Sequence, residues 1–238
     1  MDNASYATLT RQSGLRDEMQ VIANNLANVS SGGFRREGVV FSEFVARHET
    51  ADTSLSMARA HGRIIDRKEG PLRQTSGVLD LALQGEGFFM LQTENGRQLT
   101  RAGNFGLNAA GEIVASDGAR LLDGGGAPIQ VPAGAEEIRI ASDGTLSVNG
   151  NAIADVGVFL PRNPDDLVRT AGVRFTSEDG ADPVAEPQVA QGFLEGSNVS
   201  PIEEIARMIV VQRAYEAGKN LVSSEHERIR DVVRTLGK

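Results

Sequence analysis

The chain has 238 residues and a net charge of −8, with 40% hydrophobic residues, 24% charged residues and 27 glycines. This composition is ordinary for a folded protein except for the glycines, which favour many tight turns. The absence of cysteine excludes disulfides, zinc–thiolate sites and thiol nucleophiles. Residues 1–37 are neutral, residues 201–238 carry +1 and the residues between them carry −9, so no basic surface for nucleic acid is expected.

The first predicted element is a helix near the N-terminus. Its apolar residues Leu15, Met19, Ile22, Leu26 and Val29 recur at spacings of 4, 3, 4 and 3, which is the heptad pattern of a helix that packs along one seam. The hydroxyls and glycines of residues 30–33 should end this helix.

No targeting or membrane segment is expected. The first thirty residues are interrupted by charged side chains, so they lack the apolar core of a signal peptide. The longest apolar runs are also too short to cross a bilayer. If the protein leaves the cytoplasm, we expect it to do so without a cleaved signal peptide or a membrane anchor.

The middle of the chain changes to the period-two pattern of β-strands. Within residues 79–161, Asn95-Gly96, Asp143-Gly144 and Asn149-Gly150 separate apolar stretches in the manner of hairpin turns. Regular short strands predict a central antiparallel β barrel or sandwich domain. Residues 38–78 and 162–200 hold scattered apolar positions among glycine, proline, serine and charges, and we expect them to be extended arms linking this domain to the ends.

The last predicted element is a long helix. Ser200-Pro201, followed by Glu203 and Glu204, is a strong start signal. A seam with spacings of 3 and 4 then reaches the end of the chain, through Ile205, Met208, Gln212, Tyr215, Lys219, Val222, His226, Ile229, Val233 and Leu236.

Together the two ends predict an α+β protein in which residues 1–37 and 201–238 form a terminal helical assembly domain. We expect the long N- and C-terminal helices to pair as a coiled-coil-like bundle, because neither would be stable alone in water. The alternative is that both are ordinary amphipathic helices that pack on a core.

Nothing in the chain has the spacing of an active site. His48, His61 and His226 are isolated, and no metal-type spacing links them. The stretch Gln84–Phe89 lacks the third glycine of a dinucleotide loop and leads into a strand. We therefore expect a protein that is not an enzyme and has no cofactor, no metal and no small-molecule substrate.

Three local sequences carry a resemblance that spans the chain. Residues 22–29 (IANNLANV) followed by 33–36 (GFRR) resemble the N-terminal signature of bacterial flagellar rod and hook proteins. Residues 79–83 and 85–89 resemble the entry to the β domain of that family, and residues 194–199 (LEGSNV) with 212–217 (QRAYEA) resemble its C-terminal signature. Within the family, 238 residues are too few for a hook protein, and the short stretch before Leu79 is more like a proximal than a distal rod subunit.

The resemblance implies a structural subunit of the flagellar basal-body rod that crosses the periplasm. It implies export through the flagellar type III apparatus, helical polymerisation through the terminal helices, and partners that are other copies and other axial proteins. The side chains expected to carry self-assembly are Leu15, Met19, Ile22, Asn24, Asn25, Leu26, Asn28, Val29, Phe34, Ile205, Met208, Gln212, Arg213, Tyr215, Val222, Ile229 and Val233.

Other readings of the same sequence remain. The three asparagines Asn24, Asn25 and Asn28 either make hydrogen bonds within a crowded tube or only cap the end of the helix. A secreted hydrolase acting on cell-wall glycan would need a deep acidic pocket in residues 79–160. A binding module on a dimeric helical stalk would form discrete dimers rather than filaments.

Overall fold

The structure is a computed structural model that describes residues 3–47 and 54–236. The chain divides into two compact units. Unit 1 comprises the described parts of Met1–Ala27, Glu37–Ile64 and Ser200–Lys238, and unit 2 comprises Asn28–Arg36 and Ile65–Val199. Unit 1 is therefore assembled from both ends of the chain.

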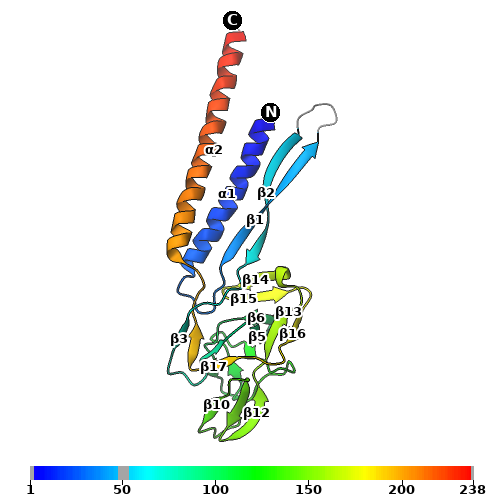
Figure 1. Cartoon of the computed structure of the whole chain (residues 1–238), viewed down its shortest axis with the longest axis vertical. Helices are drawn as coiled ribbons and strands as arrows, with labels where there is room; N and C mark the ends of the chain where they lie inside the picture. The colour runs from blue at the N-terminus through cyan, green and yellow to red at the C-terminus, as the bar shows by residue number, and fades with distance from the viewer. Residues whose placement is uncertain (1–2, 48–53, 237–238) are drawn as a thin grey trace. The chain divides into compact units, whose positions relative to one another are not determined.

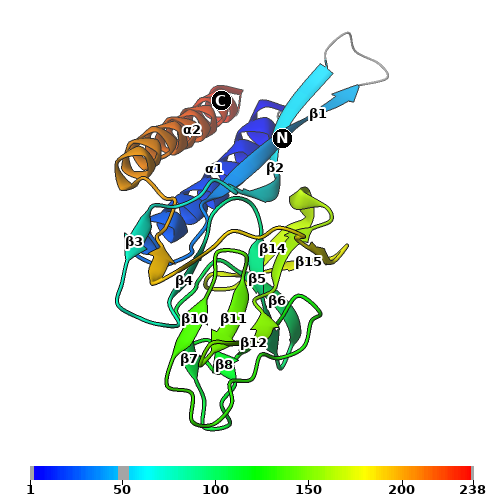
Figure 2. The same ribbon diagram turned by 60° about the horizontal axis from the view of Figure 1, so that its bottom comes forward.

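Unit 1 consists of two helices and a two-stranded sheet. The helices are α1 (Asn3–Ala27) and α2 (Pro201–Leu236), and the strands are β1 (Glu37–Arg47) and β2 (Ser54–Ile65), which pair with each other. Helix α1 lies between α2 on one side and β1 on the other (Figures 1 and 2). The α1–α2 contacts join the end of α1 to the start of α2, so the two helices run antiparallel.

Local sequence explains where the helices begin and end. Pro201 occupies the first position of α2 and Glu203 and Glu204 fill its first turn, where carboxylates favour the helix dipole. The first helical hydrogen bond joins the Glu204 amide to the Ser200 carbonyl at 3.0 Å. Helix α1 ends at Ala27, and the following turn reaches Gly33, which has a φ of +70° that favours glycine.

The expected coiled-coil-like bundle is wrong. The structure has one helix from each end, and the covered face of α2 matches the expected seam only in part, at the half-buried Met208, Tyr215 and Val222. Gln212 is exposed and Val211 is buried, and Ile205 and Ile229 are half exposed. The reason is that apolar residues surround α2 on several sides, for example in the run 209–211, so their spacing does not determine which side meets α1.

Unit 2 is a β unit that contains four sheets among the described residues. The largest follows the order β14-β15-β6-β5-β9-β8-β7, with β13 and β16 attached through β5; the others are β10-β11-β12, β17-β4 and β18-β3. The strands are β3 (Leu72–Gln74), β4 (Leu81–Leu83), β5 (Phe88–Thr93), β6 (Gly96–Thr100), β7 (Gly106–Leu107), β8 (Ile113–Val114), β9 (Arg120–Leu121), β10 (Ile138–Ile140), β11 (Thr145–Val148), β12 (Asn151–Asp155), β13 (Val158–Pro161), β14 (Leu167–Ala171), β15 (Arg174–Ser177), β16 (Ala181–Pro183), β17 (Val189–Gln191) and β18 (Phe193–Glu195). A short 3₁₀ helix, η1, spans Pro164–Asp166.

The expected barrel is also wrong, because these sheets are open and no ladder joins the β10-β11-β12 sheet to the largest one. The hairpins themselves form at the expected turns: β5 and β6 meet at Asn95-Gly96, and β11 and β12 meet at Asn149-Gly150. Such turns specify which neighbouring strands pair, but sheet closure depends on contacts far apart in the sequence.

Strand β5 organises the core of unit 2. Phe89 and Leu91 point into one apolar cluster, and Phe88 and Met90 point into a second one. Because successive side chains of a strand face opposite sides, a strand buried on both faces reads as a continuous apolar run. The segments expected to be linking arms contain β1, β2 and β3 in residues 38–78 and β14 to β18 in residues 162–200.

Candidate functional site

The side chain of Asn25, near the end of α1, is fully buried in unit 1. Its Oδ1 accepts from the Glu37 amide at 2.9 Å and its Nδ2 donates to the Glu37 carbonyl at 2.8 Å, so it pairs with β1 as a neighbouring strand would. The same Nδ2 donates to Glu204 Oε2 at 3.1 Å. A single amide therefore connects α1, β1 and α2, and because its partners are buried, replacing it would leave polar groups unsatisfied.

Further along, the two helices are joined by polar contacts. Glu18 on α1, which is 8% exposed, pairs with Arg207 on α2 at 2.7 Å. A hydrogen bond to Tyr215 raises the pKa of Arg16 above its ordinary value. At Gly218, a Cβ atom would lie 3.3 Å from the Gln12 Nε2 atom, so the glycine allows a close approach of the helices.

The residues expected to carry assembly divide into three groups. Inside unit 1, Ile22 and Asn25 are buried. The half-buried residues are Leu15, Met19, Leu26, Met208, Tyr215 and Val222 in unit 1 and Asn28 and Val29 in unit 2. The exposed ones are Asn24, Ile205, Gln212, Arg213, Ile229 and Val233, and these present the largest accessible fraction of their surface to another molecule.

Phe34, the remaining expected residue, is fully buried in unit 2. The Arg169 guanidinium lies 4.2 Å from its ring centroid and 4.7 Å from that of Phe175, within the range of a cation–π contact. Arg169 also donates to the Arg35 carbonyl. Phe34 therefore fastens the turn after α1 to β14 and β15.

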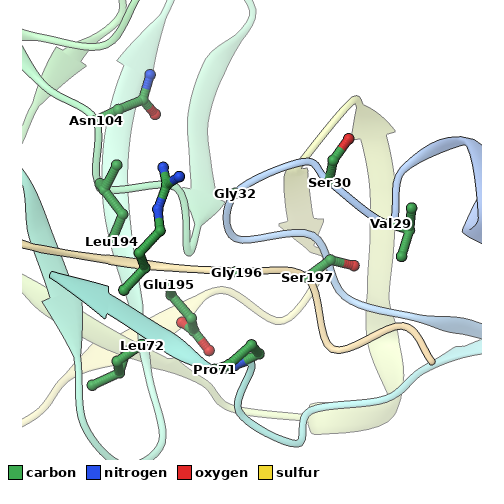
Figure 3. A pocket seen from close by; sticks show the side chains of 12 residues that line it. Val29, Ser30, Gly32, Pro71, Leu72, Asn104, Leu194, Glu195, Gly196 and Ser197 are labelled. Atoms are coloured by element: carbon green, nitrogen blue, oxygen red, sulfur yellow. The ribbon is translucent and has the colours of Figure 1, made fainter. Parts of the chain in front are cut away.

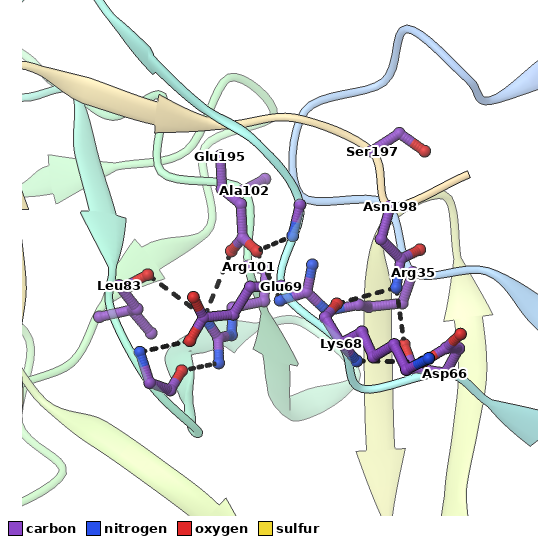
Figure 4. A network of polar contacts seen from close by, with 12 residues as sticks. Arg35, Asp66, Lys68, Glu69, Leu83, Arg101, Ala102, Glu195, Ser197 and Asn198 are labelled. Atoms are coloured by element: carbon purple, nitrogen blue, oxygen red, sulfur yellow. Dashed lines mark hydrogen bonds and ion pairs between the residues drawn. The ribbon is translucent and has the colours of Figure 1, made fainter. Parts of the chain in front are cut away.

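Unit 2 contains a second buried polar cluster, which we call the Glu195 network (Figure 4). Glu195 Oε1 accepts from Arg35 Nη2 at 2.7 Å and from the Gly70 amide at 2.8 Å, and Glu195 Oε2 accepts from Arg101 Nη1 at 3.3 Å. All three charged side chains are at most 2% exposed. Burial lowers the pKa of Arg101, whereas the charge of Glu195 acts in the opposite direction.

Asn198 holds the adjoining chain segments together (Figure 4). Its Oδ1 accepts from the Arg36 amide at 2.6 Å, and its Nδ2 donates to the carbonyls of Asp66 at 3.0 Å and Lys68 at 2.8 Å. With the Glu195 network, it joins the turn after α1, the segment after β2 and the segment after β18. The signature residues Arg35, Arg36, Glu195 and Asn198 therefore make contacts within unit 2.

Sequence reasoning did not single out Arg101, Arg169, Glu18 or Arg207. Each is an ordinary charged residue in its local pattern, and its partner lies far away: Arg101 and Glu195 are 94 positions apart. Glu195 and Asn198 belong to the C-terminal signature, and that membership was the available signal for the buried network.

A cavity of about 530 Å³ lies beside the Glu195 network (Figure 3). Its lining includes Gly32, Gly103 and Gly196 and the apolar residues Leu72 and Leu194. The one carboxylate in its lining belongs to Glu195, which two arginines already engage. This arrangement offers no free acid or base for catalysis.

A second cavity of about 530 Å³, at the β5–β6 turn, contains Glu94 and Asp117. A hydrogen bond from Arg174 holds the pKa of Asp117 below its ordinary value, which is opposite to the raised pKa that a glycosidase acid requires. Within residues 3–47 and 54–236, no group of three or more histidine or acidic side chains is placed to hold a metal. Neither described helix combines the length and apolarity that crossing a bilayer needs.

Comparisons with known proteins identify two matching family regions. Residues 82–148 match the D1 domain of the flagellar hook protein FlgE/F/G family, and residues 190–235 match the C-terminal region of flagellar basal body rod FlgEFG proteins. The first region contains β5 and most of the larger apolar cluster. The second contains Glu195, Asn198 and nearly all of α2.

Relatives align with the whole chain. The flagellar basal-body rod protein FlgF of Caulobacter vibrioides is 36% identical, with 100% of this chain and 99% of the relative covered. FlgF of Mesorhizobium japonicum is 32% identical over the same shares. The flagellar basal-body rod protein FlgG of Bacillus subtilis is 28% identical, with 96% of this chain and 97% of the relative covered.

Proposed function

Because the chain belongs to the family of flagellar hook and basal-body rod proteins, a family of structural proteins rather than enzymes, we propose that it is a proximal rod subunit that polymerises helically through unit 1. Its role as a structural component of the flagellar rod follows from family membership. The finer proposal is that its polymer forms part of the drive shaft and encloses part of the export channel.

The observation that carries the assignment is the full-length similarity to proteins named FlgF. These relatives reach 32–36% identity across the entire chain, whereas those named FlgG reach 27–28% over 89–96% of it. A distal rod subunit like FlgG is the second candidate within the family, because the same segments align with it.

Unit 1 supports the proposal that the ends mediate assembly. It leaves large apolar side chains of α2 exposed, among them Ile202 at 80% and Val233 at 64%, which a polymer contact would cover. Head-to-tail contacts that do not close give a tube rather than a ring. The proposed partners are other copies of this chain and other axial flagellar proteins.

The origin of unit 1 limits where this unit can form. Its contacts between α1 and α2 join residues 179 and 189 positions apart, so unit 1 can form only when both ends are on the same side of a membrane. We propose export by the flagellar type III apparatus without a cleaved signal peptide, followed by assembly in the periplasm.

The proposal is tested by electron microscopy of isolated basal bodies that carry an epitope tag at the Asn95-Gly96 turn. A proximal subunit places the label on the rod near the inner membrane, and a distal subunit places it near the outer membrane. Isolated basal bodies without any label, from cells that export the tagged chain, would refute the rod assignment. A chain that forms only discrete dimers would instead support the stalk alternative.

A further inference from the structure

The chain contains two Asn-Gly steps, and both lie at hairpin turns of unit 2. Asn95-Gly96 lies at the β5–β6 turn, and Asn149-Gly150 forms the β11–β12 turn. Both asparagines are exposed, and a Cβ atom added at either glycine would meet no atom within 4 Å beyond its chain neighbours. An asparagine before glycine is chemically reactive, because a residue without a side chain lets its main-chain nitrogen approach the asparagine amide. By local sequence and access to water, the two steps are therefore equivalent.

The side chain of Asn149 is held in place by the segment before β10. Its Oδ1 accepts from the amides of Glu136 at 3.1 Å and Glu137 at 3.0 Å. Its Nδ2 donates to the Gly134 carbonyl at 3.5 Å, and its own amide donates to the Glu137 carbonyl at 2.9 Å. Turning this side chain toward the Gly150 nitrogen would break its side-chain hydrogen bonds, so the fold opposes a reaction between them.

The side chain of Asn95 has no such restraint. Its main-chain amide donates to Thr93 Oγ1 at 3.2 Å, but within the described part of the chain its side-chain oxygen and nitrogen make no hydrogen bond. The turn also lies at the end of the β5–β6 ladder, where Thr93 and Gly96 form the last pair. The end of a ladder opens more easily than its centre, so the Gly96 nitrogen becomes accessible without opening the rest of the hairpin.

We propose that Asn95 is a site of spontaneous deamidation that forms isoaspartate, and that the fold protects Asn149 from the same reaction. The Gly96 nitrogen loses its proton to a solvent base and attacks Asn95 Cγ. The bond between Cγ and Nδ2 breaks, ammonia leaves, and a succinimide ring remains. Water then opens the ring. Cleavage between Cγ and the Gly96 nitrogen gives aspartate, and cleavage between the main-chain carbonyl carbon of residue 95 and that nitrogen gives isoaspartate. Overall, one water is consumed and one ammonia is released.

Either product changes the β5–β6 turn. Each adds a negative charge to a cavity lining that already includes Glu94 and Asp117. Isoaspartate also inserts a methylene group into the main chain between the paired residues Thr93 and Gly96, and the length of a hairpin loop fixes the register of its strands. Because β5 is buried on both faces, the modification acts on the strand that organises the core of unit 2. The inference does not depend on the proposed function.

Incubation of the folded full-length chain in mildly alkaline buffer tests the proposal. Trypsin cuts after arginine, so residues 74–97 and residues 140–162 form separate peptides that contain one Asn-Gly step each. Mass spectrometry measures deamidation in each peptide, and electron-transfer fragmentation distinguishes isoaspartate from aspartate and locates it. In the folded chain, Asn95 should deamidate about tenfold faster than Asn149 or more, because two hydrogen bonds to Oδ1 hold Asn149. In a parallel sample unfolded in guanidinium chloride, the two rates should become similar.

The variant Asn95→Gln is the matched control, since glutamine would have to form a larger and less favourable ring. It should fold normally, as circular dichroism can verify, and isoaspartate in residues 74–97 should disappear. Equal rates at the two steps of the folded chain, or a faster rate at Asn149, would overturn the proposal. A difference that persists in the unfolded chain would also overturn it, because the fold could not then be the cause. Isoaspartate that remains in residues 74–97 of Asn95→Gln would contradict the assignment to Asn95.

Discussion

The two units of the molecule differ in which side chains they bury and which they leave exposed. Unit 2 buries two apolar clusters and covers its charged Glu195 network completely, so its strongest interactions are internal. Unit 1 buries Glu18, Asn25, Glu37 and Glu204, while large apolar side chains of α2 remain exposed. Polar groups are buried at a cost unless they are paired, and exposed apolar groups favour association. Unit 2 therefore provides a stable body, and unit 1 provides surface for assembly.

The largest expected effect is a loss of stability in unit 2. Replacing Glu195 by alanine leaves Arg35 and Arg101 buried without their shared carboxylate, and removing one member of a buried ion pair costs about 3–5 kcal/mol. Urea unfolding followed by circular dichroism measures the change. The exposed Glu186→Ala is the control and should change the free energy of unfolding by no more than ~0.5 kcal/mol. Equal effects of the two substitutions would mean that the Glu195 network does not stabilise unit 2.

A smaller effect is expected in unit 1. Asn25→Ala should destabilise it by about 1–3 kcal/mol, because the buried amide and carbonyl of Glu37 lose their partners. The neighbouring Asn24→Ala makes the same change in helix propensity at an exposed position. Hydrogen exchange at the Glu37 amide should accelerate in Asn25→Ala and stay unchanged in Asn24→Ala. Unchanged exchange in both variants would mean that Asn25 does not hold β1 to α1.

The smallest effect concerns acid stability of unit 2. Arg174 lowers the pKa of Asp117 in the folded chain, so this carboxylate stabilises the fold above its unfolded pKa of about 3.9, and the stabilisation disappears as the pH falls through the lower folded value. Because the Asp117 side chain is 54% exposed, the contribution should stay below ~1 kcal/mol. Asp117→Asn should flatten the loss of stability below pH ~4. An acid limb as steep as that of the natural chain would contradict this contribution.

Local signals in the sequence predicted the parts of the fold that depend on neighbouring residues. The start of α2 at Pro201 and the hairpin turns at Asn95-Gly96 and Asn149-Gly150 follow from capping and turn chemistry. The buried face of α2 was predicted only in part, because Val211 and Gln212 are adjacent and the apolar pattern allows either of them to face α1. Only the position of α1 decides between them.

The candidate site was predictable only in part for a similar reason. The family signatures pointed to Asn25, Phe34 and Glu195, but their spacing gives no sign that these side chains are buried inside one chain. A buried charge is stable only beside its partner, and Arg101 lies too far from Glu195 in the sequence for a local pattern to reveal the pair.

We expect that unit 2 folds by itself and that unit 1 brings the subunit into the rod. The most direct measurement compares the natural chain with a chain that ends at residue 199, each tagged at the Asn95-Gly96 turn, in cells and in purified basal bodies. The shortened chain should keep the β structure of unit 2, be exported, and be absent from the basal bodies. A shortened chain found in the rod at the level of the natural one would contradict it.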